Sequence, residues 1–153
     1  MPNQIDFQKV ALETLRIEEK ALEILATQID ERFSRACEII LQCRGRLVIT
    51  GMGKSGHIGR KMAATFASTG TPSFFMHPGE AGHGDLGMLV YGDVLIAISN
   101  SGKSDEIIML MPLIKRLEIP LITISGDEKG PMPQNADVAL TLGNIQEACP
   151  LGL

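Results

Sequence analysis

The stretch LVITGMGKSGHIG, residues 47–59, predicts a strand, a glycine-rich turn and the start of a helix. Its first four residues are apolar or β-branched, as in a buried strand. Gly51, Gly53 and Gly56 permit backbone conformations and close approaches that a Cβ would obstruct. A helix beginning here directs unpaired N–H groups and its positive dipole end at whatever lies in front of it. We therefore expect the turn to bind an anion.

The bare pattern G-x-G-x-x-G occurs in several nucleotide sites, and neighbouring residues exclude two of them. A dinucleotide site places an acidic residue about 20 residues further on, after the second strand. Here the second strand is expected at 73–76 and is followed by His77-Pro78, with no acid before Glu80. A P-loop needs a glycine five residues before its Gly-Lys-Ser, where this sequence has Val48. With both nucleotide sites excluded, the motif is a glycine-rich turn that carries a lysine.

Lys54 gives this turn a flexible positive charge, suited to a phosphate, a carbonyl oxygen or a developing enolate. The alternative is a lysine that is only solvated in the first turn of a helix. The helix dipole disfavours a cation at that end, which weakens the alternative.

Length, charge and cysteine content limit the class of protein. The 153 residues suit one domain with a real core, and the net charge of −4 argues against a nucleic-acid surface. No run approaches 18 apolar residues and no signal-peptide pattern is present, so we expect a cytoplasmic protein without a membrane partner. Cys37, Cys43 and Cys149 show no C-x-x-C spacing, which favours reduced thiols over a metal site.

Two helices are expected before the first strand, in an N-terminal unit at 1–45. Residues 4–29 carry one stripe of apolar residues at spacings of three, four and seven, and a second stripe at Val10, Ile17 and Ile24. A helix that is apolar on more than one side needs more than one neighbour. We expect it to pack on its own domain and on another subunit; the alternative is packing within its own chain. A second helix is expected from Asp30 to about Gln42.

The remainder, 46–153, alternates strands with helices. Helices are expected at 60–68, at 105–117 and, as a short proline-rich segment, before the last strand; strands are expected at 73–76, 93–98, 120–124 and 138–142. Such alternation predicts a three-layer αβα sandwich around a five-stranded parallel, doubly wound sheet of flavodoxin-like type. Ligands bind such sheets beyond the carboxyl ends of the strands. The Gly/Ser-rich loops 51–56, 99–104 and 125–126 should therefore converge on one site.

The loop 99–104, Ser-Asn-Ser-Gly-Lys-Ser, places three hydroxyls, an amide and a lysine on a strand-to-helix turn. Hydroxyls and helix N-terminal N–H groups bind a phosphate monoester without the magnesium that a triphosphate demands. A sugar phosphate fits this loop better than ATP. The alternative is an N-capping serine cluster, which would need one hydroxyl and not three.

Four ordered motifs together resemble a known family. They are GMGKSG at 51–56, HGDLG at 83–87, SNSG at 99–102 followed by Glu106, and EACPLGL at 147–153. From about Leu47 to Leu153 the sequence is similar to the sugar isomerase (SIS) domain of the arabinose-5-phosphate isomerases. The resemblance implies interconversion of D-ribulose 5-phosphate and D-arabinose 5-phosphate, which feeds the Kdo sugar of lipopolysaccharide or capsule. It also implies a homotetrameric core and a following pair of CBS domains, which this sequence does not contain.

The resemblance also assigns site residues. By motif, the catalytic lysine is Lys54, the two functional glutamates are Glu106 and Glu147, and the zinc-linked histidine is His77. No cofactor is implied as required, and the zinc modulates or inhibits turnover. The family's catalytic histidine in a Ser-His-Pro-Gly context lies beyond the last residue here, so we expect this stretch alone to lack a complete catalytic set. The expected substrate contacts are Gly53, Ser55, Gly70, Thr71, His83, Ser99, Asn100, Ser101 and Ser104.

Chemistry supports these roles independently. Aldose–ketose isomerisation through an enediol needs a base for the carbon-bound proton and a donor or charge beside the developing oxyanion. We assign Lys54 to the oxyanion or carbonyl, and Glu106 and Glu147 to proton transfer without deciding which is the base. Glu106 has an alternative role as a first-turn carboxylate that complements a helix dipole. His77 and His83 could hold a metal with Glu80, or could form only local hydrogen bonds.

Two other functions stay open at this point. A sugar-phosphate sensor would use the same fold without catalysis, as in transcription regulators that carry a SIS domain. It would need the serine loop but not Lys54, Glu106 and Glu147 together. The other alternative is an isomerase for a different sugar phosphate.

Overall fold

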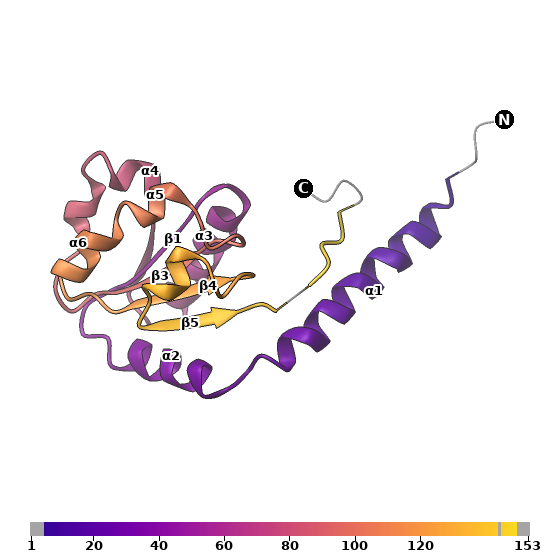
Figure 1. The fold of residues 1–153 in the computed structure, drawn as a ribbon, viewed down its shortest axis with the longest axis horizontal. Coiled ribbons are helices and arrows are strands. Elements are labelled where there is room, and N and C mark those ends of the chain that lie inside the picture. The colour runs from indigo at the N-terminus through magenta and orange to yellow at the C-terminus, as the bar shows by residue number, and fades with distance from the viewer. Residues whose placement is uncertain (1–4, 144, 150–153) are drawn as a thin grey trace.

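A five-stranded parallel sheet forms the centre of the computed structural model, which describes residues 5–143 and 145–149 (Figure 1). The strand order is β2-β1-β3-β4-β5, and each neighbouring pair is parallel. The strands are β1 (Leu47–Gly51), β2 (Ser73–Met76), β3 (Val94–Ile98), β4 (Leu121–Ser125) and β5 (Val138–Thr141). This order confirms the predicted doubly wound sheet, whose direction of winding changes between β1 and β3.

Helices cover both faces of the sheet. The helices are α1 (Phe7–Ala26), α2 (Glu31–Leu41), α3 (Gly53–Ser68), α4 (Pro78–Ala81), α5 (Asp105–Ile108), α6 (Met111–Arg116) and α7 (Pro131–Gln134), with a 3-10 turn, η1, at Asp85–Met88. Residues of α2 and α3 pack with Ile49 and Ile96 on one face. Residues of α4 to α7 pack with Val48 and Leu95 on the other face. The predicted three layers are confirmed.

The predicted single helix at 105–117 is wrong, because α5 ends at Ile108 and α6 begins at Met111. Pro112 lies in the first turn of α6. Proline has no N–H to donate to the carbonyl four residues earlier, and its ring clashes there, so a continuous helix cannot pass this point. The first helix is also shorter than expected: it begins after the cap residue Asp6, whose side chain accepts the Lys9 N–H, and it ends at Ala26.

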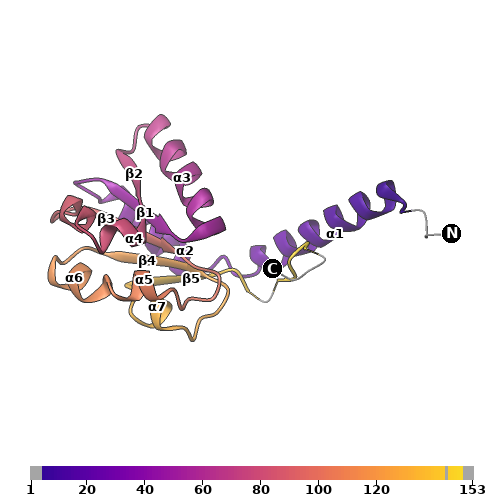
Figure 2. The ribbon, with the colours of Figure 1, turned by 90° about the horizontal axis from the view of Figure 1, so that it is seen from above.

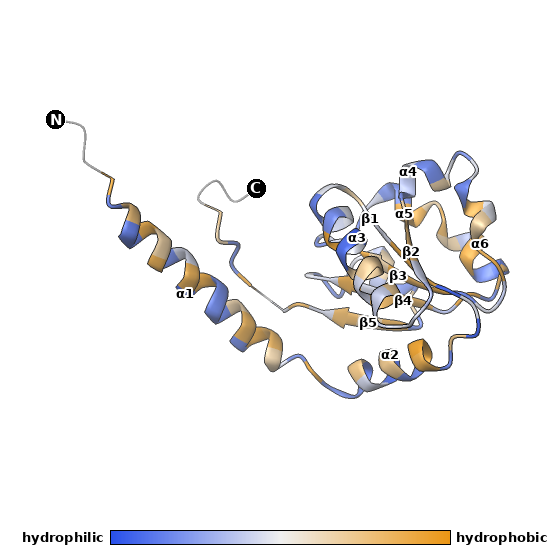
Figure 3. Cartoon of the chain, turned by 180° about the vertical axis from the view of Figure 1, so that it is seen from behind, coloured by the Kyte–Doolittle hydropathy of each residue, from blue (hydrophilic) through white to orange (hydrophobic). Residues whose placement is uncertain are grey.

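Helix α1 extends away from the sheet (Figures 1 and 2). None of its residues is buried in this chain, and hydrophobic residues occur along its length (Figure 3). The exposed large apolar residues of α1 and its flanks are Ile5, Phe7, Val10, Leu12, Leu15, Leu22 and Ile29. Near its carboxyl end, Leu22 and Leu25 share a groove with Leu142 and Ile145. Packing on another subunit stays a prediction. No described helix has both the length and the apolar character needed to cross a bilayer.

Two buried threonines in the sheet allow a paired stability prediction. Thr123 in β4 is fully buried, and its hydroxyl has no hydrogen-bond partner among the described residues. Thr50 in β1 is equally buried, but its hydroxyl donates to the Met76 carbonyl at 2.8 Å. We expect Thr123→Val to raise the free energy of unfolding by about 1 kcal/mol, and Thr50→Val to lower it by about 1 kcal/mol. Urea titration of both variants measures this, and equal losses would contradict it.

Candidate functional site

A cleft of about 1100 Å³ opens at the carboxyl ends of the strands. Its described lining comes from α3, from the ends of β3 and β4 and the loops that follow them, and from the segment after β5, with one residue from α1. The lining residues are Glu18, Lys54, Ser55, Ile58, Met62, Ile98, Asn100, Ile124, Gly126, Asp127, Glu128, Lys129, Leu142, Gly143, Ile145, Glu147, Ala148 and Cys149. The loops after β1, β3 and β4 thus converge as predicted.

Lys54 reaches the cleft because α3 begins abruptly after β1. Gly53 has a φ of 51°, which favours glycine, and a Cβ on Gly56 would lie 2.6 Å from the Gly51 carbonyl oxygen. These two glycines let the first turn of the helix lie directly against the strand. The N-cap residue Met52 provides no side-chain acceptor for the first-turn N–H groups. This end of a 16-residue helix is therefore suited to an anion in the cleft.

The 99–104 loop is held together by its own hydroxyls. Ser99 is buried, and its oxygen lies 2.9 Å from that of Ser104 and 3.4 Å from that of Ser101. The Ser101 hydroxyl also accepts the Lys103 N–H at 3.2 Å. Ser104 is the N-cap of α5 but forms no side-chain cap bond, so capping does not explain this serine. Within this loop it is Asn100 that lines the cleft.

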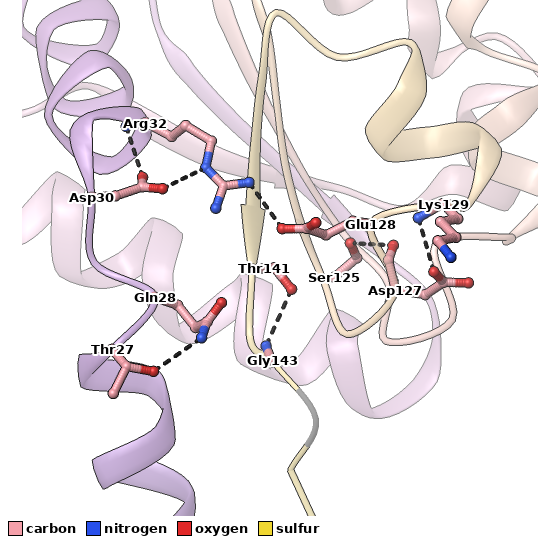
Figure 4. A network of polar contacts seen from close by, with 10 residues as sticks. All are labelled: Thr27, Gln28, Asp30, Arg32, Ser125, Asp127, Glu128, Lys129, Thr141 and Gly143. Atoms are coloured by element: carbon pink, nitrogen blue, oxygen red, sulfur yellow. Dashed lines mark hydrogen bonds and ion pairs between the residues drawn. The ribbon is translucent and has the colours of Figure 1, made fainter.

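The loop after β4, residues 126–129, forms a wall of the cleft. Sequence analysis expected its start at Gly126 but missed Asp127, Glu128 and Lys129, which are drawn as sticks in Figure 4. Its Gly126 N–H donates to the Asn100 carbonyl at 2.9 Å, and the Lys129 N–H donates to the Asp127 carboxylate at 2.8 Å. The Lys129 N–H and the Lys103 ammonium, 3.5 Å away, hold the pKa of Asp127 below its usual value. The wall could have been expected, since Asp127 directly follows the Ser125-Gly126 turn at the carboxyl edge of the sheet.

The structure separates the two predicted glutamates. Glu147 lines the cleft with Lys54, whereas Glu106 lies half-buried in the first turn of α5, outside the lining. Cys149 also lines the cleft and was expected only as a reduced thiol. Residues 150–153 of the EACPLGL motif lie outside the described residues.

The predicted histidines, His77 and His83, do not line the cleft. His77 is the N-cap of α4, where its Nδ1 accepts the Gly79 N–H at 3.2 Å, and His83 is exposed. Because Nδ1 accepts the Gly79 N–H, the proton of a neutral His77 ring is on Nε2. Zinc binding at Nε2 would therefore require the other tautomer. No group of three potential ligands among the described residues is arranged to hold a metal.

Gly70 and Thr71 lie at the opposite edge of the sheet. They precede β2, whereas Lys54 follows β1, and these parallel strands are neighbours. Gly70 lines a separate hollow with Arg46 and Phe74. One chain alone therefore does not bring the predicted contacts at Gly70 and Thr71 together with Lys54.

Comparison with known proteins gives the family. The SIS domain family matches residues 40–148. The chain is 60% identical over 146 residues to arabinose 5-phosphate isomerase KdsD of Francisella tularensis, and 59% identical over 148 residues to the KdsD of Escherichia coli K12. These matches cover 94% and 97% of this chain but only 45% of each relative, so the chain spans about half their length.

A solved structure agrees with this similarity. It is an E. coli CFT073 protein in complex with arabinose 5-phosphate, which superposes with a TM-score of 0.85 at 38% identity. The match covers 97% of this chain and 81% of that one. Together with the five-stranded sheet and the cleft at its carboxyl edge, these matches show that the chain belongs to the SIS domain family.

Proposed function

We propose that the protein containing this SIS domain interconverts D-ribulose 5-phosphate and D-arabinose 5-phosphate, the step that feeds Kdo synthesis. One observation carries the proposal: Lys54, Asn100 and Glu147 come from three separate segments, the start of α3, the loop after β3 and the segment after β5, and line one cleft. The high identity to relatives named arabinose 5-phosphate isomerase, and the structural relative in complex with arabinose 5-phosphate, support the choice of sugar.

The proposed arrangement places the phosphate at the amino end of α3, with the Ser55 and Asn100 side chains beside it. The N–H groups of this helix end favour a dianion. Lys54 then stabilises negative charge on the sugar oxygen as the enediolate forms, and Glu147 carries the proton between the two adjacent carbons. Glu106 is proposed to support that transfer from outside the cleft lining. No step in this scheme requires a cofactor, and a modulating zinc at His77 stays a prediction.

We also propose that the protein is a cytoplasmic homo-oligomer, with a tetramer as the expected state. The exposed apolar residues of α1 support association of α1 with further copies of the chain. Size measurement of the full-length protein by light scattering tests the subunit number.

Isotope exchange tests the isomerase directly. When the full-length protein is incubated with D-ribulose 5-phosphate in heavy water, we expect solvent deuterium at carbon 2 of the aldose product. The base removes a proton from carbon 1 of the ketose, this proton exchanges with solvent while the enediol is present, and the base then delivers deuterium to carbon 2. Binding without catalysis leaves the carbon–hydrogen bonds intact. Mass spectrometry of the recovered sugar measures incorporation, and D-ribulose without its phosphate is the matched control. Binding of the phosphate sugar without exchange would identify a sensor and contradict the proposal.

A further inference from the structure

The charge of the cleft lining does not suit a dianion by itself. Its described charged residues are the carboxylates Glu18, Asp127, Glu128 and Glu147 and the ammonium groups of Lys54 and Lys129. Carboxylates outnumber cations there, while a phosphate monoester carries a charge of about −1.5 to −2 at neutral pH. Unless other groups offset the excess, the lining repels the proposed ligand.

Two cations outside the lining pair with the two carboxylates of the 126–129 wall. The Arg32 guanidinium lies 2.9 Å from the Glu128 carboxylate, and the Lys103 ammonium lies 3.5 Å from Asp127. Arg32 lies in the first turn of α2, 96 positions from Glu128 in the sequence (Figure 4). Its Nε atom also lies 2.9 Å from the Asp30 carboxylate. Hydrogen bonds to Glu128 and then Asp30 raise the pKa of Arg32, so it stays charged.

We propose that Arg32 is a positioning residue that acts through Glu128: it neutralises this carboxylate on the cleft wall and thereby permits the phosphate dianion to bind. The inference rests on the proposed function, because it needs a sugar phosphate as the ligand. Arg32 does not line the cleft, and no motif implicates it. Since the Arg32 and Glu128 side chains are 42% and 53% exposed, solvent screens the effect and it is several-fold in size.

Substitutions that remove the charge but keep a polar side chain test this role in the full-length protein. We expect Arg32→Gln to raise KM about fivefold with kcat nearly unchanged, because one uncompensated carboxylate acts on a dianion through partly screened solvent. Glu128→Gln alone should not raise KM. The double variant should return KM to near the parent value, since the repelling charge is gone. The matched control is Arg35→Gln, because Arg35 pairs with Glu38 on α2 and does not line the cleft.

An Arg32–Glu128 ion pair that only holds the loop in place would give a different pattern of KM values. If Glu128→Gln raises KM as much as Arg32→Gln, and the double variant is not restored, the ion pair acts by holding the wall and the proposal is overturned. An unchanged KM in Arg32→Gln also overturns it. The fivefold difference should shrink when salt rises from about 20 mM to about 300 mM, because screening shortens the reach of the exposed charge.

Binding of inorganic phosphate separates this inference from the proposed function. Calorimetric titration of the same variants should give the same order of affinities whether or not the protein turns over a sugar. If that order holds and no variant catalyses exchange, the isomerase proposal fails and the role of Arg32 stands. If turnover is normal and Arg32→Gln binds inorganic phosphate as tightly as the parent does, the inference about Arg32 fails and the isomerase proposal stands. Thermal melting of each variant verifies that it is folded.

Discussion

Replacing Lys54 with alanine in the full-length protein is expected to lower kcat for sugar-phosphate isomerisation by about a thousandfold, the size seen when one preorganised charge or donor is removed from an active site. Lys54 lies in the first turn of α3 and lines the cleft with Asn100 and Glu147. Its ammonium is proposed to face the oxygen on which charge develops. A loss confined to the transition state lowers kcat and kcat/KM together, and steady-state assays measure both.

Lys61 provides the matched control for this substitution. It lies on the same helix, is exposed and does not line the cleft. Lys61→Ala should therefore keep activity within about twofold, since removal of a surface charge far from the ligand is largely screened. If Lys54→Ala raises KM but leaves kcat intact, Lys54 only binds phosphate, and the assignment to the oxyanion is contradicted.

The sheet and the position of the cleft could be predicted from local patterns. Continuous apolar runs such as 94–98 predict strands that are buried on both faces, and every residue of β3 is buried. Once the strands are parallel, the loops after β1, β3 and β4 must lie at one edge. For this reason the sequence alone predicts that Lys54 and Asn100 lie at one site, and both line the cleft.

The pairing of segments far apart in the sequence could not be predicted. Arg32 and Glu128 show no local pattern, because their contact depends on how α2 docks beside the loop after β4. Glu106 has the residue type and spacing of a site residue, yet the short α5 places it outside the cleft lining. A motif records residue types in order, whereas the direction of a side chain depends on packing. For the same reason, Gly70 was predicted to contact the substrate, but it lines a separate hollow at the edge of the sheet opposite the cleft.

The amino edge of the sheet is held by two aspartates that each precede a strand. The Asp93 carboxylate, fully buried before β3, accepts the Arg46 N–H at 2.7 Å and the Val90 N–H at 3.1 Å. It also pairs with the Arg46 guanidinium at 3.1 Å. Asp137, before β5, accepts the Leu121 N–H at 2.7 Å and is exposed. Each carboxylate thus fixes the start of the neighbouring strand in register.

Replacing Asp93 with alanine is therefore expected to lower the free energy of unfolding by about 3 kcal/mol, because the change removes the acceptor of two partly buried N–H groups, those of Arg46 and Val90, and the ion pair between a fully buried carboxylate and the Arg46 guanidinium. Asp137→Ala, which loses one such bond at an exposed position, should cost about 1 kcal/mol. Urea unfolding followed by circular dichroism measures both. Because Asp93 lies at the edge of the sheet opposite the cleft, folded Asp93→Ala protein should keep the parent's affinity for inorganic phosphate. A small loss of stability for Asp93→Ala, equal to that for Asp137→Ala, would mean that water replaces the buried carboxylate and that burial adds nothing to its role.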